Sequence, residues 1–170
     1  ARRSRRPLLV AVLIVLAALF ALAALAGNLA AGTPITLRYD STTFTMRNSG
    51  SYPLNVFKLQ FVRGEDGGGD DFTGDRIKGD LIPPESCFQI ISTGRPEHVP
   101  ADCEPLYSFE QLMDARLFFW RQENRSGETF PEFRVLYDRQ VIDTCATVAE
   151  GGQAECRFNW PVTPTPAASG

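Results

Sequence analysis

The stretch "FRVLYDRQVIDTC", Phe133 to Cys145, predicts two short strands joined by a tight turn. Its apolar residues form two runs, and the polar pair Asp138 and Arg139 separates them, as expected of a β-hairpin. The chain continues as "CATVAEGGQAEC", which ends at Cys156 and contains adjacent glycines. We therefore expect a second turn here, closed by its own disulfide.

Similar short strands are predicted along most of the chain. The segment "ITLRY" alternates, with Ile35, Leu37 and Tyr39 on one face, and Phe44 and Met46 alternate in "TFTMR". Further strands are expected at 54–62, with a bulge where the apolar phase changes, and at 87–91, 117–121 and 155–160. The segment Ser108–Ala115 is the one helix predicted within residues 33–160, because Ser108 and Gln111 fit a capping box. About eight strands at this spacing predict an all-β, immunoglobulin-like β-sandwich over residues 33–160.

A basic and then apolar segment precedes this domain. Nineteen uncharged residues, Leu8–Ala26, follow four arginines, and as a helix they would cross a hydrocarbon core of about 30 Å. We predict one transmembrane helix over residues 7–31 and a cytoplasmic flank over residues 1–6, which places the domain outside by the positive-inside rule. The arginines that set this topology are Arg2, Arg3, Arg5 and Arg6.

Two alternatives apply to the same segment. Ala24-Leu25-Ala26 fits a signal-peptidase pattern, so the domain could instead be secreted after cleavage, although the apolar run is longer than most signal peptides have. Small residues four positions apart, such as Ala17 and Ala21, could also let two helices pack as a dimer.

The charge balance argues against nucleic acid as a partner. The chain has a net charge of -3, and because the N-terminal arginines contribute +4, the remainder carries -7. Such a domain lacks the basic surface that displaces counterions from phosphates. The end of the chain, residues 161–170, is rich in Pro, Thr and Ala and is interpreted as a tail or linker.

Four cysteines all fall on the side predicted to be extracytoplasmic, where disulfides persist. Of the three possible connectivities, the spacing favours two local pairs, Cys87 with Cys103 and Cys145 with Cys156. A zinc site is disfavoured because the sequence has no C-x-x-C and one histidine.

The acidic, glycine-rich loop "GEDGGGDDFTGD" raises the question of a metal site. No alignment of this loop with the EF-hand calcium-binding pattern places the required residues, so a solvated loop without a metal is the favoured interpretation. A calcium site that follows no known motif, built from Asp70, Asp71 and Asp75, is the alternative, and no other cofactor is expected.

Catalysis is not expected in this chain. The single histidine, His98, lies in a proline-flanked loop, and no G-x-S-x-G nucleophile elbow is present. The aromatic run Phe118, Phe119 and Trp120 is interpreted as core rather than as a binding surface, since alternation would send its side chains to both sides of a strand.

Several stretches together resemble an extracytoplasmic module of Chloroflexota-type bacterial membrane proteins: "LRYDSTTFTMRNSGSYPLNVFKLQF", "LIPPESCFQI", "FFW" and "FRVLYDRQVIDTC". In those proteins the module commonly follows one transmembrane helix, often C-terminal to a serine/threonine kinase domain. The first two stretches also resemble the lamin-tail class of immunoglobulin-like domains. This resemblance implies a fold and a topology but no catalytic residue, so any kinase activity would lie outside this chain.

The sequence therefore predicts a single-pass, membrane-anchored, non-enzymatic binding or sensing module that contacts other proteins. The ectodomain of a receptor-like protein is one form of this hypothesis. A structural or accessory subunit of a larger bacterial membrane complex is the alternative, and a secreted domain is a third hypothesis.

Overall fold

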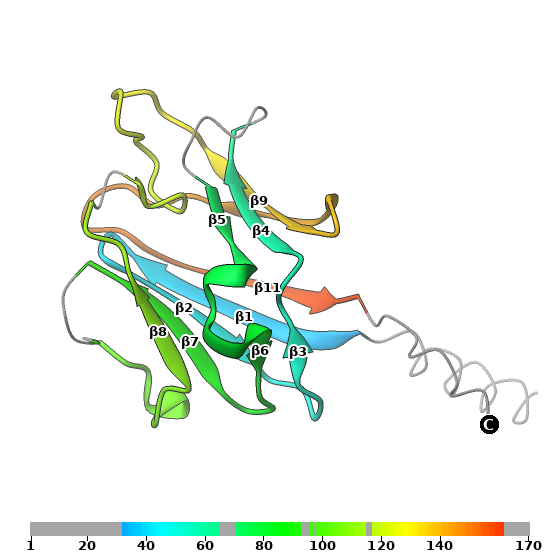
Figure 1. The fold of residues 1–170 in the computed structure, drawn as a ribbon. Helices are drawn as coiled ribbons and strands as arrows, with labels where there is room; N and C mark the ends of the chain where they lie inside the picture. The colour runs from blue at the N-terminus through cyan, green and yellow to red at the C-terminus, as the bar shows by residue number, and fades with distance from the viewer. Residues whose placement is uncertain (1–31, 65–70, 93–95, 97, 115–116, 162–170) are drawn as a thin grey trace, which may run out of the picture. The chain divides into compact units, whose positions relative to one another are not determined.

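The computed structural model describes residues 32–64, 71–92, 96, 98–114 and 117–161, which form strands and short 3-10 turns (Figure 1). The strands are β1 (Thr33–Asp40), β2 (Thr43–Asn48), β3 (Leu54–Asn55), β4 (Leu59–Arg63), β5 (Asp71–Thr73), β6 (Leu81–Ile82), β7 (Cys87–Ile91), β8 (Ser108–Gln111), β9 (Glu132–Tyr137), β10 (Gln140–Ala146) and β11 (Gln153–Trp160). The 3-10 turns are η1 (Gly74–Arg76), η2 (Lys78–Asp80) and η3 (Ala101–Cys103).

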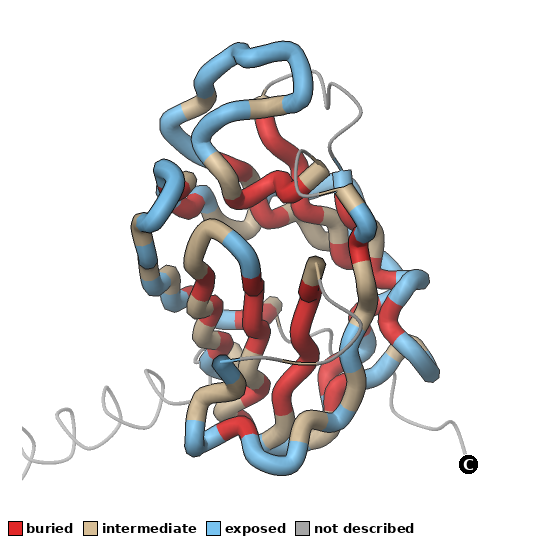
Figure 2. Tube along the Cα trace, turned by 90° about the vertical axis from the view of Figure 1, so that its left-hand side faces the viewer, coloured by how far each residue is buried: buried red, intermediate tan, exposed pale blue. Residues whose placement is uncertain are grey.

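Two sheets face each other across an aromatic core. The five-stranded sheet has the order β11-β1-β2-β7-β8 and the four-stranded sheet the order β10-β9-β4-β5, while β3 and β6 pair separately. Phe44 of β2 meets Phe61 of β4 with ring centroids 5.1 Å apart, and Tyr39 of β1 meets Phe133 of β9 at 5.5 Å. Figure 2 shows the buried residues concentrated along the strands, with exposed residues mainly in the loops. The predicted all-β class is confirmed, with two sheets arranged as in a sandwich.

Strand β1 has the predicted alternation. Ile35, Leu37 and Tyr39 are at most 4% exposed, whereas the intervening residues Thr36 and Arg38 are half-buried on the outer face. Because successive side chains of a strand point to opposite faces, this pattern gives the five-stranded sheet one apolar face and one polar face.

The predicted hairpin between β9 and β10 is confirmed. Asp138 and Arg139 form its turn, and both have positive φ, 51° and 67°, as a type I′ hairpin turn requires. Tyr137 pairs with Gln140 across the turn.

The predicted disulfide between Cys145 and Cys156 is present, but it does not close a hairpin. Cys145 lies in β10 of the four-stranded sheet and Cys156 in β11 of the five-stranded sheet. The chain changes sheets between the two strands, so this disulfide links one sheet to the other.

The expectation of a single bulged strand at 54–62 is wrong. The chain forms β3 and then β4, which belong to different sheets, with a turn closed by the hydrogen bond from the Leu59 amide to the Val56 carbonyl at 2.9 Å. The phase of the apolar residues changes because the chain changes sheet. Gly74 packs against this turn so closely that a Cβ there would lie 1.7 Å from the Val56 oxygen.

The helix predicted at Ser108–Ala115 is also wrong, because Ser108–Gln111 is strand β8. This strand runs parallel to β7, and backbone hydrogen bonds from Tyr107 to Cys87 at 3.0 Å and from Leu112 to Ile91 at 2.8 Å flank the pairing. A capping box is a weak local signal, and the ladder with β7 overrides it.

No strand forms at residues 117–121, again contrary to prediction; the described segment consists of turns with an isolated bridge at Arg121. The interpretation of its aromatic residues as core is nevertheless confirmed, since Phe118, Phe119 and Trp120 are all fully buried. The buried Arg63 explains how irregular backbone is tolerated here. Its Nη1 donates to the carbonyls of Phe118, Arg121 and Glu123 at 2.9–3.1 Å, which takes the place of sheet hydrogen bonds.

Candidate functional site

The candidate site lies on the outer, polar face of the five-stranded sheet, where the segment joining β7 to β8 passes over the strands. The described part of this segment is residues 92, 96 and 98–107, and the disulfide Cys87–Cys103 fastens it to the start of β7. Thr43 and Thr45 point to this outer face, yet they are only 8% and 4% exposed. The crossing segment therefore covers part of a face that a simple sandwich would leave open to solvent.

A chain of ion pairs holds the crossing segment to the sheet. Asp102 accepts a hydrogen bond from Arg38 of β1 at 2.6 Å and lies 3.5 Å from the guanidinium of Arg47 in β2. Arg38 also donates to Glu155 of β11 at 3.0 Å, and Arg47 donates to Glu85 at 2.7 Å. The five charges alternate in sign across the face, so that each arginine lies between two carboxylates.

These contacts change the ionisation of the acidic members. Hydrogen bonding from Arg38 is the main cause that lowers the pKa of Asp102 below its ordinary value, and the same donor lowers the pKa of Glu155. Both groups therefore stay charged over the whole physiological pH range.

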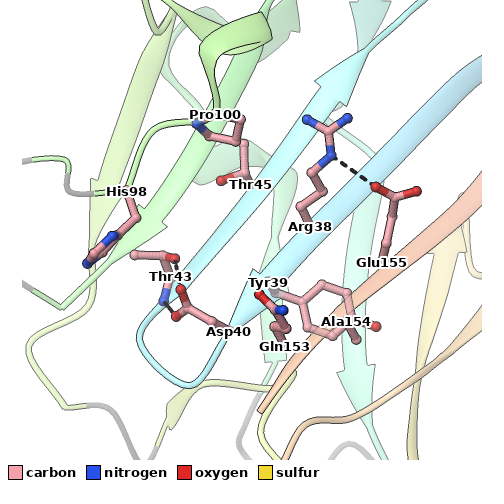
Figure 3. A pocket seen from close by; sticks show the side chains of 10 residues that line it. All are labelled: Arg38, Tyr39, Asp40, Thr43, Thr45, His98, Pro100, Gln153, Ala154 and Glu155. Atoms are coloured by element: carbon pink, nitrogen blue, oxygen red, sulfur yellow. Dashed lines mark hydrogen bonds and ion pairs between the residues drawn. The ribbon is translucent and has the colours of Figure 1, made fainter. Parts of the chain in front are cut away.

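A groove of about 400 Å³ opens beside this ion-pair chain, between the crossing segment and strands β1, β2 and β11 (Figure 3). In Figure 3, His98, Thr43 and Asp40 lie toward one end of the groove, and Arg38 and Glu155 lie toward the other. The remaining lining residues are Tyr39, Thr45, Pro100, Gln153 and Ala154. Hydroxyl, amide, imidazole and charged groups are thus all present, which suits hydrogen bonding to a polar ligand.

The end of the groove formed by Asp40 is held rigidly. Burial acts to raise the pKa of Asp40, but four hydrogen bonds from Thr42 and Thr43 to its carboxylate outweigh burial, and the pKa is lowered overall. The Asp40 carbonyl accepts a hydrogen bond from the indole of Trp120 at 2.7 Å.

Tyr39 closes the groove from the core side. Its hydroxyl donates to the Ala146 carbonyl at 2.6 Å, and burial raises the pKa of this phenol to about 12. Tyr39 therefore remains neutral at physiological pH, and its hydrogen bond fixes it as a wall of the groove.

The structure does not assemble the alternative calcium site among the residues that it describes. Asp71 is exposed at the start of β5, Asp75 is exposed in η1, and Asp70 lies outside the described residues. Within the described ranges, no three His, Cys, Asp or Glu side chains are grouped so as to hold a metal ion.

Both predicted cysteine pairs are bonded, and no cysteine is free. Disulfides of this kind are typical of an oxidising, extracytoplasmic environment. Among the described residues, no helix is long and apolar enough to cross a membrane. The predicted transmembrane helix at 7–31, the four N-terminal arginines and the tail from residue 162 lie outside the described residues.

Sequence reasoning missed the two arginines that organise this face. Arg38 and Arg47 occupy outward positions of β1 and β2, so alternation could have placed them on the polar face. Their partner Asp102 could not have been found in this way, because it reaches the face only through the fold of the crossing segment.

No protein-family model, curated protein or solved structure matches this chain.

Proposed function

We propose that this protein is a single-pass, membrane-anchored module whose extracytoplasmic β-sandwich binds or senses a ligand without catalysing a reaction. The observation that carries the proposal is the pair of disulfides in a domain that follows the apolar segment Leu8–Ala26. Disulfides favour the outside of the cell, and an uncharged segment of this length preceded by arginines favours an anchor with its N-terminus inside.

The groove on the five-stranded sheet is the ligand site that we propose. Three kinds of contact fix its walls: the disulfide Cys87–Cys103, the ion pairs of Asp102 and the hydrogen bonds of Asp40. A rigid site loses little conformational entropy when a ligand binds, which favours recognition. Because the pKa of Tyr39 is raised and the carboxylates of Asp40 and Glu155 are already engaged, the groove offers fixed hydrogen-bonding groups rather than an acid–base pair.

We also propose that the sandwich is immunoglobulin-like and of the lamin-tail class. Asn48 supports this assignment, because it connects the two stretches that carry the resemblance. It is fully buried, and its side-chain amide donates to the carbonyls of Tyr52, Ile82 and Pro83 at 2.8–3.0 Å. The turn after β2 is thereby joined to the proline-rich turn before β7.

The proposal is tested by expressing the full chain with a C-terminal tag in a bacterial host. Protease added to intact spheroplasts should remove the tag while the anchor stays in the membrane fraction, and non-reducing gels should show both disulfides formed. A protected tag together with reduced cysteines would overturn the topology.

The same preparation separates the alternative hypotheses. In mild detergent, a receptor-like module should purify alone or as a dimer, whereas an accessory subunit should bring other chains in fixed stoichiometry. A mature N-terminus directly after Ala26 would show instead that the domain is secreted.

A further inference from the structure

Both ends of the described domain meet at one end of the sandwich (Figure 1). Thr33, the first residue of β1, pairs with Trp160, the last residue of β11. The ring of Trp160 contacts Tyr137 with centroids 4.9 Å apart, which brings the β9–β10 turn to the same place. The turn after β2 lies there as well, since the Ser49 amide donates to the Pro34 carbonyl at 3.0 Å. We call this region the entry end of the domain.

Large apolar side chains are exposed at the entry end. Tyr52, in the turn after β2, is 73% exposed, Phe57 is 57% exposed before β4, and Val141 is 52% exposed just after the β9–β10 turn. The start of β4 is joined to that turn by the ion pair of Lys58 with Asp138 at 2.9 Å. Two of these side chains therefore come from connections and the third from the start of β10, and the fold gathers all three at one end.

The opposite end of the sandwich differs. There the β1–β2 turn, the 121–129 loop and the β10–β11 loop present mainly polar side chains. In the described part of the chain, the large apolar residue exposed on that side is Met113, which is 83% exposed. Its position follows from the strand pairing: Gln111, two residues earlier, pairs with Ile91, and Ile91 pairs with Thr43 near the β1–β2 turn. The two ends thus contrast in apolar exposure.

The length of chain between the apolar segment and β1 limits what can cover the entry end. Only Gly27–Gly32 separate Ala26 from Thr33, and six residues span about 20 Å at full extension. If Leu8–Ala26 crosses the membrane, as the proposed function requires, the entry end must lie within that distance of the bilayer surface.

We propose that the entry end rests on the lipid bilayer, with Tyr52, Phe57 and Val141 in the headgroup region. Aromatic side chains favour this zone because one part of the ring is apolar and the tyrosine hydroxyl remains hydrated. Arg139, exposed beside the Lys58–Asp138 ion pair, flanks the apolar residues and suits an anionic headgroup. The contact holds the groove at a fixed distance and orientation from the membrane. This inference rests on the proposed single-pass topology.

The test uses the full chain in vesicles of phosphatidylcholine and phosphatidylglycerol whose acyl chains are brominated near the headgroups. A fluorescent coumarin amino acid replaces Tyr52 in one protein and Met113 in a matched control, both of which are exposed positions. We expect bromolipid to quench the probe at position 52 and to leave the probe at position 113 unchanged. Adding Phe57→Ser and Val141→Ser to the first protein should reduce the quenching.

Protease protection in the same vesicles separates this inference from the proposed function. If the anchor spans the membrane and the probe at position 52 is not quenched, the bilayer contact is wrong while the topology stands. A blue shift of the probe emission without quenching would show that a second protein copy covers the entry end. Equal quenching at positions 52 and 113 would show that the domain has no fixed orientation on the bilayer. Either result overturns the inference. Failure of the anchor to span the membrane overturns both proposals.

Discussion

Two irregular segments of the domain are held in opposite ways. The segment between β8 and β9 places Phe118, Phe119 and Trp120 in the core, where Phe119 stacks on Phe61 with centroids 4.8 Å apart. The segment between β7 and β8 crosses the polar outer face instead and is held by one disulfide and by the ion pairs of Asp102. We call the first the core segment and the second the crossing segment.

Their composition explains the difference. The core segment supplies three adjacent aromatic side chains, each of which removes a large apolar area from water and so offsets the entropy of ordering irregular backbone. The crossing segment, "STGRPEHVPADCEPLY", has few apolar residues and cannot bury enough area to order itself. A segment of this composition requires covalent or ionic attachment, and the structure supplies both.

The largest effect is expected from removing an aromatic ring of the core segment. Phe119→Ala deletes a fully buried ring between the two sheets and should lower the free energy of unfolding by about 3–5 kcal/mol. Denaturant unfolding monitored by tryptophan fluorescence measures this loss. Met113→Ala, at a position 83% exposed, is the control and should change stability by less than about 0.5 kcal/mol. Equal losses in the two variants would contradict the burial argument.

Arg63 is the next most sensitive position, because it satisfies the backbone of the core segment. Arg63→Met keeps most of the side-chain volume but leaves the carbonyls of Phe118, Arg121 and Glu123 without this donor, which should cost about 3 kcal/mol. Amide hydrogen exchange should locate the loss around residues 117–123. If the exchange of these amides were unchanged, the assigned role of Arg63 would be wrong.

Removing the disulfide of the crossing segment should produce a loss of different character. The double substitution Cys87→Ser and Cys103→Ser opens a loop with a sequence separation of 16, for which chain entropy gives about 3 kcal/mol. The ion pairs of Asp102 still hold the segment in the variant, so the expected loss in the free energy of unfolding is about 2–3 kcal/mol. Hydrogen exchange should rise at β8 and leave the core segment protected. The matched variant Cys145→Ser and Cys156→Ser should instead loosen the contact between β10 and β11. Identical exchange patterns in the two variants would mean that the disulfides do not hold separate regions.

The regular parts of this fold could be predicted from the sequence because their signals are local. The alternation of Ile35, Leu37 and Tyr39 specifies the inner face of β1, and the turn at Asp138 and Arg139 specifies a hairpin. The cysteine pairs follow from short spacing in the same way. Each of these features is determined by residues close together in the chain.

The irregular parts could not be predicted because their partners are distant. Nothing near Phe118 in the sequence shows that Arg63, 55 residues earlier, donates to its carbonyl, so the aromatic run alone predicts a strand. The parallel pairing of β8 with β7 likewise overrides a local helix signal at Ser108. The groove has no local signal in the sequence for the same reason: it exists only where the crossing segment folds over β1 and β2.

The smallest expected effect concerns the ionic attachment of the crossing segment. Asp102→Asn removes the charge that pairs with Arg38 and Arg47, and because this carboxylate is 37% exposed, its loss should cost only about 0.5 kcal/mol. The folded pKa of Asp102 is lowered from an ordinary value of 3.8, so its contribution is present above that pH and disappears as the pH falls through the folded pKa. The stability difference between the wild-type protein and Asp102→Asn should therefore be constant at neutral pH and vanish in strong acid. High salt should also reduce it, because exposed ion pairs are screened. A difference that persists unchanged at low pH and at high salt would contradict the assigned role of the Asp102 charge in holding the crossing segment.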